Sequence, residues 1–347
     1  MTYMLMLNPG YNRVYYEESK RLCLCEFNIA LAKVTVACSD VRLEKVSSVC
    51  CLAFTAEEKL EAKDITVLSR LSFVYAMFEY SIDASEKITL FPLEKNENYY
   101  IDPSITTILK YSGKTNELFT RMILNIALLS SYFEFDGQLS VFDPVCGKGT
   151  TLYDALAMGH NAYGIDINDK IVIEAQQFLK KFLEVEKYKH ECRILKQSGQ
   201  KPLYKAVRYT FEIGKDRYEM KTNPHTAEFV SCNSAYADSI FKANMFHIIA
   251  GDLPYGVQHG NVAGSGSKGV TRNPRELLET CLPAWHRVLK KGGVLTLSWN
   301  SFLIDREEVS AILKKHRFDV LDNEYYNSLE HKVDNAIKRD VVFAVKK

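Results

Sequence analysis

The stretch LSVFDPVCGKGTTLYDALAMGHNAYGIDIN, residues 139–168, predicts a β-strand, a glycine-containing turn, a helix and a second β-strand in direct succession. Residues 139–142 form an apolar run typical of a buried strand, and residues 152–159 are typical of a short helix. Gly147 and Gly149 allow the turn to bend sharply and let the backbone approach a ligand closely. The N-terminus of the helix then presents N–H groups to a partial negative charge. These features predict a nucleoside-binding pocket at one edge of a parallel sheet.

The positions of the acids and glycines in this stretch distinguish between cofactors. Asp166 ends the second strand, where a carboxylate can accept hydrogen bonds from both hydroxyls of a ribose. A dinucleotide fingerprint would place a third glycine at Leu152, and a phosphate-binding P-loop would place a glycine at Phe142. We therefore expect a cofactor with an adenosine but no pyrophosphate, namely S-adenosylmethionine (SAM), with Asp143 and Pro144 facing its methionine end. The other residues expected at this cofactor site are Cys146, Gly147, Gly149, Thr150, Ile167 and Asn168.

The overall composition is that of a soluble globular protein. The chain has 347 residues, of which 47% are hydrophobic and 25% are charged, and it is long enough for two domains. No apolar run reaches the roughly 18 residues of a membrane span, and the N-terminal MTYMLMLNPG lacks the basic flank of a signal peptide. The nine cysteines show no CxxC spacing, which favours buried thiols in a reducing compartment over a metal site. We therefore expect a cytoplasmic protein without a metal.

The net charge of +1 hides an uneven distribution of charge. Residues 1–112 carry 12 Lys or Arg against 15 Asp or Glu, whereas residues 180–225 carry 12 against 6. Aromatic residues lie between the basic residues of this second segment, a mixture that suits a phosphate backbone with stackable bases. The alternative is a solvent-exposed hairpin, because residues 207–213 alternate like a strand and the following GKDR can form a turn. Both interpretations of this basic insertion stay open.

The strand and helix patterns divide the chain into two parts. Residues 1–82 follow a β–α–β–β–α–β order, with the second helix expected to open at Thr55, and predict a small ferredoxin-like α+β domain. Residues 83–112 are expected to form a polar connector. From residue 139 onward strands and helices alternate, which is typical of an open, mostly parallel sheet. We therefore predict an α/β protein with a Rossmann-like domain at residues 113–347, preceded by the small domain.

The sequence GDLPYG at residues 251–256 directly follows the apolar run MFHIIA. Proline and glycine are common in turns, so a simple turn at the end of a buried strand is one interpretation. An acid, a proline and an aromatic residue at the end of a strand also suit a pocket for a flat ring that carries an amine.

Several motifs give residues 110–347 a resemblance to a known family. DPVCGKGTT at 143–151, GIDIN at 164–168 and GDLPYG resemble those of the RNA guanine-N2 methyltransferases of the tRNA position-10 type, relatives of the THUMP-domain methyltransferases. SGKTNELFTRMILNIA at 112–127 is similar to the entry segment of that family, and HKVDNAIKRDVVFAVKK at 331–347 to its closing strand. The chain departs from the family in two ways. The N-terminal part is too short for a ferredoxin-like domain plus a THUMP domain, and the usual DPPY is DLPY here.

The resemblance implies methyl transfer from SAM to an exocyclic amine, guanine N2 in a structured RNA such as tRNA. It implies that the Asp252 carboxylate and a backbone carbonyl near Leu253 orient the amine. Pro254 would stiffen the loop, and Tyr255 would stack on the base. Transfer that relies on alignment needs no covalent intermediate, so Cys146 is expected to be a packing residue.

The same resemblance implies further contacts with the cofactor. Thr115 and Asn116 would contact the methionine carboxylate, although TNEL is also a helix N-cap sequence. Asn233 and Ser234 would meet the adenine amine, with capping at the end of a strand as the alternative. Residues 257–269, which follow GDLPYG, are expected either to form a lid or to be disordered.

Two other functions stay open at this stage. DNA adenine or cytosine amino-methyltransferases share the tetrapeptide, so DNA is an alternative substrate. A protein that binds SAM and RNA without catalysis is the other alternative. The sequence leaves the nucleotide position, the degree of methylation and the oligomeric state open.

Overall fold

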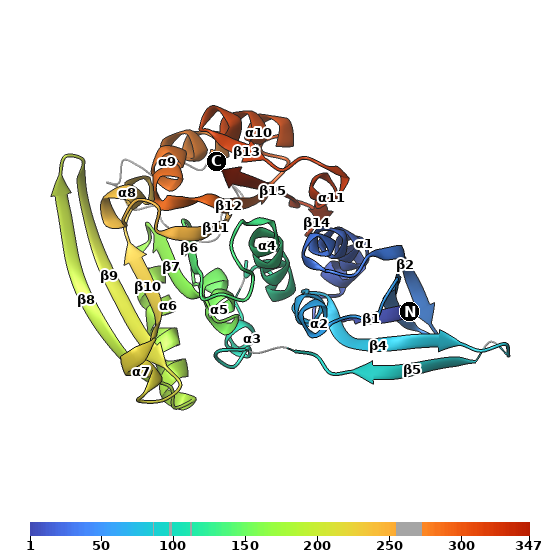
Figure 1. The fold of residues 1–347 in the computed structure, drawn as a ribbon. Helices are drawn as coiled ribbons and strands as arrows, with labels where there is room; N and C mark the ends of the chain where they lie inside the picture. Colours follow the sequence, from blue (N-terminus) through green and yellow to red (C-terminus); the bar gives the residue numbers. More distant parts are fainter. Residues whose placement is uncertain (86, 97–98, 112, 255–272) are drawn as a thin grey trace.

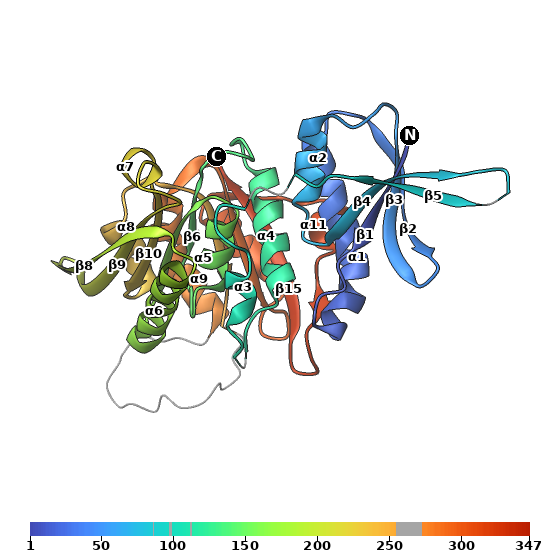
Figure 2. The same ribbon diagram turned by 90° about the horizontal axis from the view of Figure 1, so that it is seen from below.

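The computed structural model contains two β-sheets with helices between them (Figures 1 and 2). The N-terminal sheet is drawn in blue and cyan, and the larger second sheet in green to red. The predicted stacking residue Tyr255 and the expected lid segment lie outside the described residues. The structure describes residues 1–85, 87–96, 99–111, 113–254 and 273–347.

The first sheet is antiparallel and is built from the N-terminal part of the chain. Its strands have the order β2-β3-β1-β4-β5. The predicted β–α–β–β–α–β order is confirmed, and β5, which lies in the expected connector, pairs with β4. The elements are β1 (Thr2–Leu7), α1 (Arg13–Ala30), the 3₁₀ helix η1 (Leu31–Lys33), β2 (Cys38–Val46), β3 (Val49–Ala56), α2 (Ala62–Ser69), β4 (Val74–Ile82) and β5 (Ile88–Leu93).

The start of α2 differs from the sequence prediction. Thr55 lies inside β3, and the helix begins at Ala62 instead. Glu61 and Asp64 form a reciprocal capping box at this position. The buried Asp64 carboxylate also accepts a hydrogen bond from the Thr35 amide at 2.7 Å. This second capping signal prevails because its carboxylate is buried and satisfies several donors at once.

The second sheet has parallel strands at its centre and antiparallel strands at both edges. Its order is β13-β15-β12-β11-β6-β7-β10-β9-β8, with β14 paired to β15. The pairs that join β12, β11, β6, β7 and β10 are parallel. This arrangement confirms the predicted α/β class with a Rossmann-like, mostly parallel centre. The strands are β6 (Ser140–Asp143), β7 (Asn161–Asp166), β8 (Lys189–Gln200), β9 (Leu203–Gly214), β10 (His225–Ser231), β11 (Phe246–Asp252), β12 (Leu289–Asn300), β13 (Phe318–Val320), β14 (His331–Lys332) and β15 (Lys338–Lys346).

Helices cover both faces of the second sheet, and two separate apolar clusters fill the two interfaces. Helices α4, α5 and α6 pack on one face, and α8, α9 and α10 on the other. The helices are α3 (Ile105–Ile108), α4 (Glu117–Ser130), α5 (Thr150–Ala157), α6 (Asp169–Val185), α7 (Glu219–Thr222), the 3₁₀ helix η2 (Ser234–Tyr236), α8 (Ala237–Ile240), α9 (Pro274–Val288), α10 (Arg306–Lys315) and α11 (Glu324–Asn327).

The strand order reverses between β6 and β11. From β6 the chain proceeds to β7 on one side, whereas β11 is followed by β12 on the other. In open α/β sheets, ligands bind beyond the carboxyl ends of the strands at such a reversal. Asp143 is the last residue of β6, and Asp252 is the last residue of β11. The fold therefore brings both carboxylates to the edge where a ligand site is expected.

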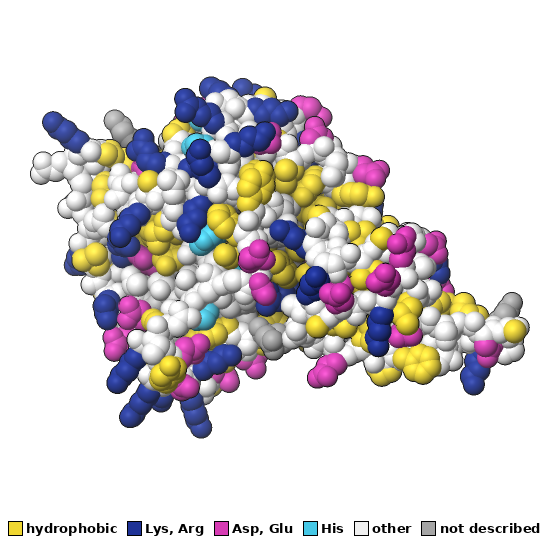
Figure 3. Space-filling model, viewed as in Figure 1, with side chains coloured by type: hydrophobic (Ala, Val, Ile, Leu, Met, Phe, Trp, Pro, Cys, Tyr) yellow, Lys and Arg dark blue, Asp and Glu magenta, His cyan; other side chains and the backbone are white. Residues whose placement is uncertain are grey.

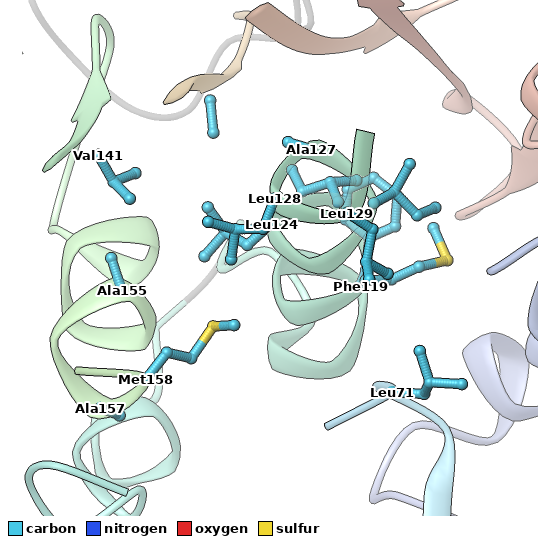
Figure 4. Close-up of a cluster of buried hydrophobic side chains, with 14 of the residues drawn as sticks. Leu71, Phe119, Leu124, Ala127, Leu128, Leu129, Val141, Ala155, Ala157 and Met158 are labelled. Atoms are coloured by element: carbon cyan, nitrogen blue, oxygen red, sulfur yellow. The ribbon is translucent and has the colours of Figure 1, made fainter. Parts of the chain in front are cut away.

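Helix α4 lies at the centre of an apolar core that runs from the first sheet to the second. It contacts α1 on one side and α5, β11 and β12 on the other. Figure 4 shows α4 side chains between α5 and the N-terminal part, with Leu71 on the N-terminal side. The labelled residues of this core are Leu71, Phe119, Leu124, Ala127, Leu128, Leu129, Val141, Ala155, Ala157 and Met158.

A buried polar network also joins α1 to α4. The Glu26 carboxylate accepts hydrogen bonds from the Ser72 amide and from Asn125 Nδ2 of α4, both at 2.9 Å. The same Asn125 nitrogen donates to the Arg70 carbonyl at 2.7 Å. Burial raises the pKa of Glu26, and its hydrogen bonds to Ser72 and Asn125 oppose that shift. Buried polar groups require hydrogen-bond partners, so these bonds fix the position of α1 against α4.

The basic insertion extends the second sheet. Strands β8 and β9 form a long antiparallel hairpin that turns at residues 201–202, and β9 pairs with β10. The prediction that GKDR forms the turn of the hairpin is wrong, because residues 214–217 lead from β9 into α7. Figure 3 shows Lys and Arg side chains on the half of the molecule that holds α6, β8 and β9, whereas Asp and Glu are prominent around α1.

Candidate functional site

The glycine turn connects β6 to the first residue of α5, Thr150. Gly147 and Gly149 have φ angles of +49° and +87°, which side chains rarely adopt. A Cβ atom at Gly149 would lie 3.0 Å from Cζ of Tyr153. A Cβ at Gly147 would have no described heavy atom within 4 Å. Packing therefore requires the second glycine, whereas the first leaves open space beside the backbone.

Asp166 binds the turn through both of its carboxylate oxygens. Oδ2 accepts a hydrogen bond from the Gly147 amide at 2.9 Å, and Oδ1 accepts one from the Asn168 amide at 2.8 Å. Burial raises the pKa of Asp166, and these two amides oppose the shift. The neighbouring Ile167 is apolar but 44% exposed, while Asn168 caps α6. This arrangement can accept the hydroxyls of a ribose beside an apolar surface for a flat base.

Asp143 is buried at the end of β6, close to the end of β11. Its neighbour Pro144 packs on β11, since a Cβ at Gly251 would lie 3.2 Å from Pro144 Cγ. Burial raises the pKa of Asp143 to about 7, and the negative charges of Asp252 and Asp166 add to this effect. A cation bound here would favour the ionised carboxylate.

Cys146 packs tightly on β7. A Cβ at Gly164 would lie 2.7 Å from the Cys146 Cβ, so the glycine turn and β7 approach closely here. Burial raises the pKa of the Cys146 thiol well above its usual value. A thiol in this state is a packing group and not a nucleophile.

Asp252 is held by two hydroxyl groups from other parts of the chain. Its Oδ2 accepts a hydrogen bond from Thr115 Oγ1 at 2.6 Å, and its Oδ1 accepts one from Ser298 Oγ. Ser298 lies directly opposite Asp252 in the register of β11 and β12. The side chain of Asp252 keeps 20% of its surface exposed. The carboxylate is thus fixed in direction and still accessible from the site.

Arg339 of β15 is the cation near this carboxylate. Its Nη2 lies 3.6 Å from Asp252 Oδ2, and its side chain is 5% exposed. The guanidinium also lies 4.4 Å from the ring centroid of Phe119, the ring of which contacts Tyr15 of α1 and His331. Contacts between side chains therefore lead from the N-terminal helix to the carboxylate.

The other residues of the GDLPYG motif have different environments. Leu253 is buried, and its amide donates to the Ser298 carbonyl at 2.8 Å, which continues the pairing of the strands. Pro254 is exposed. The stacking role of Tyr255 stays a prediction, because that residue lies outside the described part of the chain.

Two predicted cofactor contacts have other partners within the protein. Thr115 donates to Asp252, so its hydroxyl supports the carboxylate. The Asn116 side chain caps α4 by accepting hydrogen bonds from the Leu118 and Phe119 amides at 2.9 and 3.2 Å, as TNEL predicts. A contact of either residue with a methionine carboxylate stays a prediction.

Asn233 and Ser234 lie just after β10 and have structural partners. The Asn233 side chain caps η2 by accepting from the Ala235 amide at 2.9 Å. Ser234 Oγ accepts from Trp285 Nε1 at 2.9 Å in the core. These bonds explain both residues as local structure, and their contact with an adenine stays a prediction.

Arg208 of the basic insertion has a structural role. Arg208 donates from Nε to the buried carboxylate of Glu228 at 2.5 Å and from Nη1 to Gln197 at 3.0 Å. Its guanidinium also lies 5.6 Å from the ring centroid of Phe241. Arg208 therefore holds β9 to β10 and the segment after α8.

Ser298 and Arg339 were not identified from the sequence. Ser298 stands near the end of an apolar strand, so the rule that ligand sites gather at the carboxyl ends of parallel strands could have identified it. Arg339 carries no such signal, because β15 is antiparallel and enters the site from its other end.

Within the described ranges, no group of three His, Cys, Asp or Glu side chains has a geometry that could hold a metal ion. Each helix within the described ranges is too short or too polar to cross a bilayer.

Solved structures similar to this chain include SAM-dependent methyltransferases. A TehB-like enzyme from Corynebacterium glutamicum matches with 16% identity and a TM-score of 0.34, covering 60% of this chain and 81% of that chain. Magnesium protoporphyrin IX methyltransferase from Synechocystis with bound SAM matches with 15% identity and a TM-score of 0.37, covering 68% and 87%. A SAM-dependent methyltransferase from Methanosarcina mazei matches with 16% identity and a TM-score of 0.38, covering 62% and 94%.

No protein-family model matches the sequence, and no curated protein matches it significantly. The identities and TM-scores of the solved structures are too low to bear on a substrate. The fold assignment rests on the strand order of the second sheet.

Proposed function

We propose that this protein is a SAM-dependent methyltransferase that acts on an exocyclic amine of a nucleobase, guanine N2 in a structured RNA such as tRNA. The observation that carries the proposal is the oriented Asp252 carboxylate at the end of β11, beside the glycine turn. A simple turn does not need a carboxylate fixed by two hydroxyls and a buried arginine.

The glycine turn and its acids fit SAM in size and charge. The open space beside Gly147 lets a ligand approach the backbone, and Asp166 can accept both ribose hydroxyls. The exposed Ile167 offers an apolar surface for the adenine. Asp143 would pair with the ammonium of the methionine part, which would stabilise its ionised form.

The role of Asp252 follows from the chemistry of an aromatic amine. The lone pair of such an amine is delocalised into the ring, and SAM when bound supplies an electrophilic methyl group. A hydrogen bond from one amine proton to Asp252, and a second to a carbonyl near Leu253, would direct the lone pair out of the ring plane. Asp252 would also accept the proton that the methylated nitrogen releases. Alignment and electrostatics would provide the rate acceleration.

Two features support RNA as the substrate. The hairpin of β8 and β9 presents exposed basic side chains, among them Lys196 and Lys205, at the edge of the second sheet, which suits a phosphate backbone. The motifs that resemble the tRNA position-10 enzymes favour guanine N2 among the exocyclic amines.

The proposal is tested by binding and methylation together. Calorimetry should detect binding of SAM and of its demethylated product, weakened in Asp166→Ala. Incubation with SAM and unmodified tRNA should yield N2-methylguanosine by nucleoside mass spectrometry. Methylation of DNA but not of RNA would show that the protein is a DNA amino-methyltransferase instead. Binding of SAM without methylation of either polymer would leave only a binding protein.

A further inference from the structure

A cavity close to Asp252 is lined by residues from both parts of the chain. It has a volume of about 590 Å³ and is lined by Tyr11 and Asn12, which precede α1, and by residues of the 107–117 segment. Pockets that bind small molecules usually measure about 300–1,000 Å³. The cavity is therefore large enough for an organic ligand, which would contact both the N-terminal part and the second part of the chain.

The inner end of this cavity reaches the proposed catalytic group. Thr115 lines the cavity and donates to Asp252 at 2.6 Å. Tyr111 also lines it, and its hydroxyl lies 3.1 Å from Oγ1 of Thr150 at the start of α5. A smaller cavity of about 60 Å³ shares Asn12 with the first and extends to Arg339. A ligand in the main cavity would thus lie between the N-terminal loop, the glycine turn and Asp252.

The residues that line the cavity include two aromatic and two cationic side chains among uncharged polar ones. Tyr11 is 95% exposed, an unusual state for a large ring in a folded protein, and Tyr111 lies further inside. Lys110 is exposed at the rim. Lys114 donates to the Thr106 carbonyl at 2.5 Å and lies 3.7 Å from Glu117, the one acid that lines the cavity among the described residues. Rings for stacking and ammonium groups for phosphate are what a nucleotide requires.

We infer that this cavity holds the target nucleotide of the RNA, with Tyr11 against the base or its neighbour and Lys110 on the adjoining phosphate. This inference rests on the proposed function and adds that the N-terminal unit forms one wall of the substrate site. The amine of a base placed here would reach Asp252 past Thr115, while SAM would bind at the glycine turn.

The test compares Tyr11→Ala and Lys110→Glu with matched controls, Tyr75→Ala and Lys59→Glu. Tyr75 is 59% exposed on β4, and Lys59 is exposed in the loop before α2. In methylation assays with unmodified tRNA, the two cavity variants should raise KM about tenfold or more, consistent with the loss of one stacked base or one phosphate contact. The controls should match the parent protein, and calorimetry with SAM should give an unchanged Kd for all four variants. Cavity variants that methylate RNA like the parent would overturn the inference and leave the proposed function intact.

A second measurement does not depend on RNA methylation. Ligand-observed NMR with guanosine 5′-monophosphate should detect binding to the parent protein that Tyr11→Ala and Lys110→Glu weaken. Saturating S-adenosylhomocysteine should leave this binding in place. If S-adenosylhomocysteine displaced the nucleotide, the cavity would belong to the cofactor site and the inference would be wrong. If the parent protein bound the nucleotide here but methylated no RNA, the cavity would still be a nucleotide-binding site, and the proposed function would be wrong.

Discussion

The glycine turn and the surroundings of Asp252 lie next to each other but are built differently. The turn, its acid and its helix come from one continuous β–α–β unit at residues 139–168. Asp252 instead depends on Thr115 before α4, Ser298 of β12 and Arg339 of β15. The proposed cofactor side is thus a local structure, whereas the proposed catalytic side forms only when distant segments have packed. Substitutions on the two sides should therefore affect different steps.

The largest effect is expected for Asp252→Asn. The asparagine keeps the shape of the side chain but loses the charge, so it orients the amine less well and accepts no proton. Methyl transfer should fall by about two to three orders of magnitude, as for loss of an oriented hydrogen bond in a closed site. SAM affinity, measured by calorimetry, should stay within a few fold. If Asp252→Asn folded and kept full activity, GDLPYG would be only a simple turn.

A smaller loss is expected when a support of Asp252 is removed. Ser298→Ala deletes the hydroxyl that donates to Oδ1, and a hydrogen bond to a charged group contributes about 1.5–3 kcal/mol. Methyl transfer should fall about tenfold or more, with little change in the KM for SAM. Thr296→Val is the matched control, because Thr296 Oγ1 is buried on the same strand and has no hydrogen-bond partner among the described residues. Equal rates for both variants would show that the Ser298 hydroxyl does not position Asp252.

The two glycines of the turn should separate stability from binding. Gly149→Ala places a Cβ against Tyr153 at a positive φ, so it should lower the free energy of unfolding by roughly 1–3 kcal/mol. Gly147→Ala should lower the free energy of unfolding by about 1–2 kcal/mol, from backbone strain alone, because the space beside Gly147 is open. Urea unfolding with and without SAM measures both effects. SAM should stabilise Gly147→Ala less than the parent, since the new Cβ enters the ligand space.

The smallest effect concerns pH and Asp143. The pKa of its carboxyl is raised to about 7 in the folded protein, so the folded chain holds this proton more tightly than the unfolded chain. This contribution to stability is present at low pH and is lost as pH rises from about 4 to about 7. Pairing with the SAM ammonium needs the ionised form, so SAM affinity should rise with pH below about 7, by at most tenfold per pH unit. Calorimetry across this range should show a slope that Asp143→Asn removes.

The local unit could be predicted from the sequence because its signals lie close together in the chain. Asp143, Gly147, Gly149 and Asp166 all lie where the strand, turn and helix pattern of 139–168 places them. The order of elements in the N-terminal part was predicted for the same reason. The predicted start of α2 was wrong because the sequence contains two competing capping patterns. The burial of the carboxylate decides between them, and this burial depends on the tertiary structure.

The surroundings of Asp252 could not be predicted in the same way. Ser298 meets Asp252 through the register of β11 and β12, and Arg339 arrives from an antiparallel strand. Composition likewise predicted a basic insertion but could not show that Arg208 pairs with the buried Glu228. Replacing Arg208 would therefore destabilise the sheet as well as change any contact with RNA.

The position of α4 between the two sheets has a consequence for folding cooperativity. Its apolar side chains belong at once to the core under the first sheet and to the core on the second, and Asn125 is bound to Glu26 of α1. Helix α1 packs between α4 and the first sheet, so separating α1 from α4 exposes apolar surface of both parts. The chain should consequently unfold in a single calorimetric transition. A fragment that starts after the N-terminal sheet should expose one side of α4 and aggregate when expressed alone.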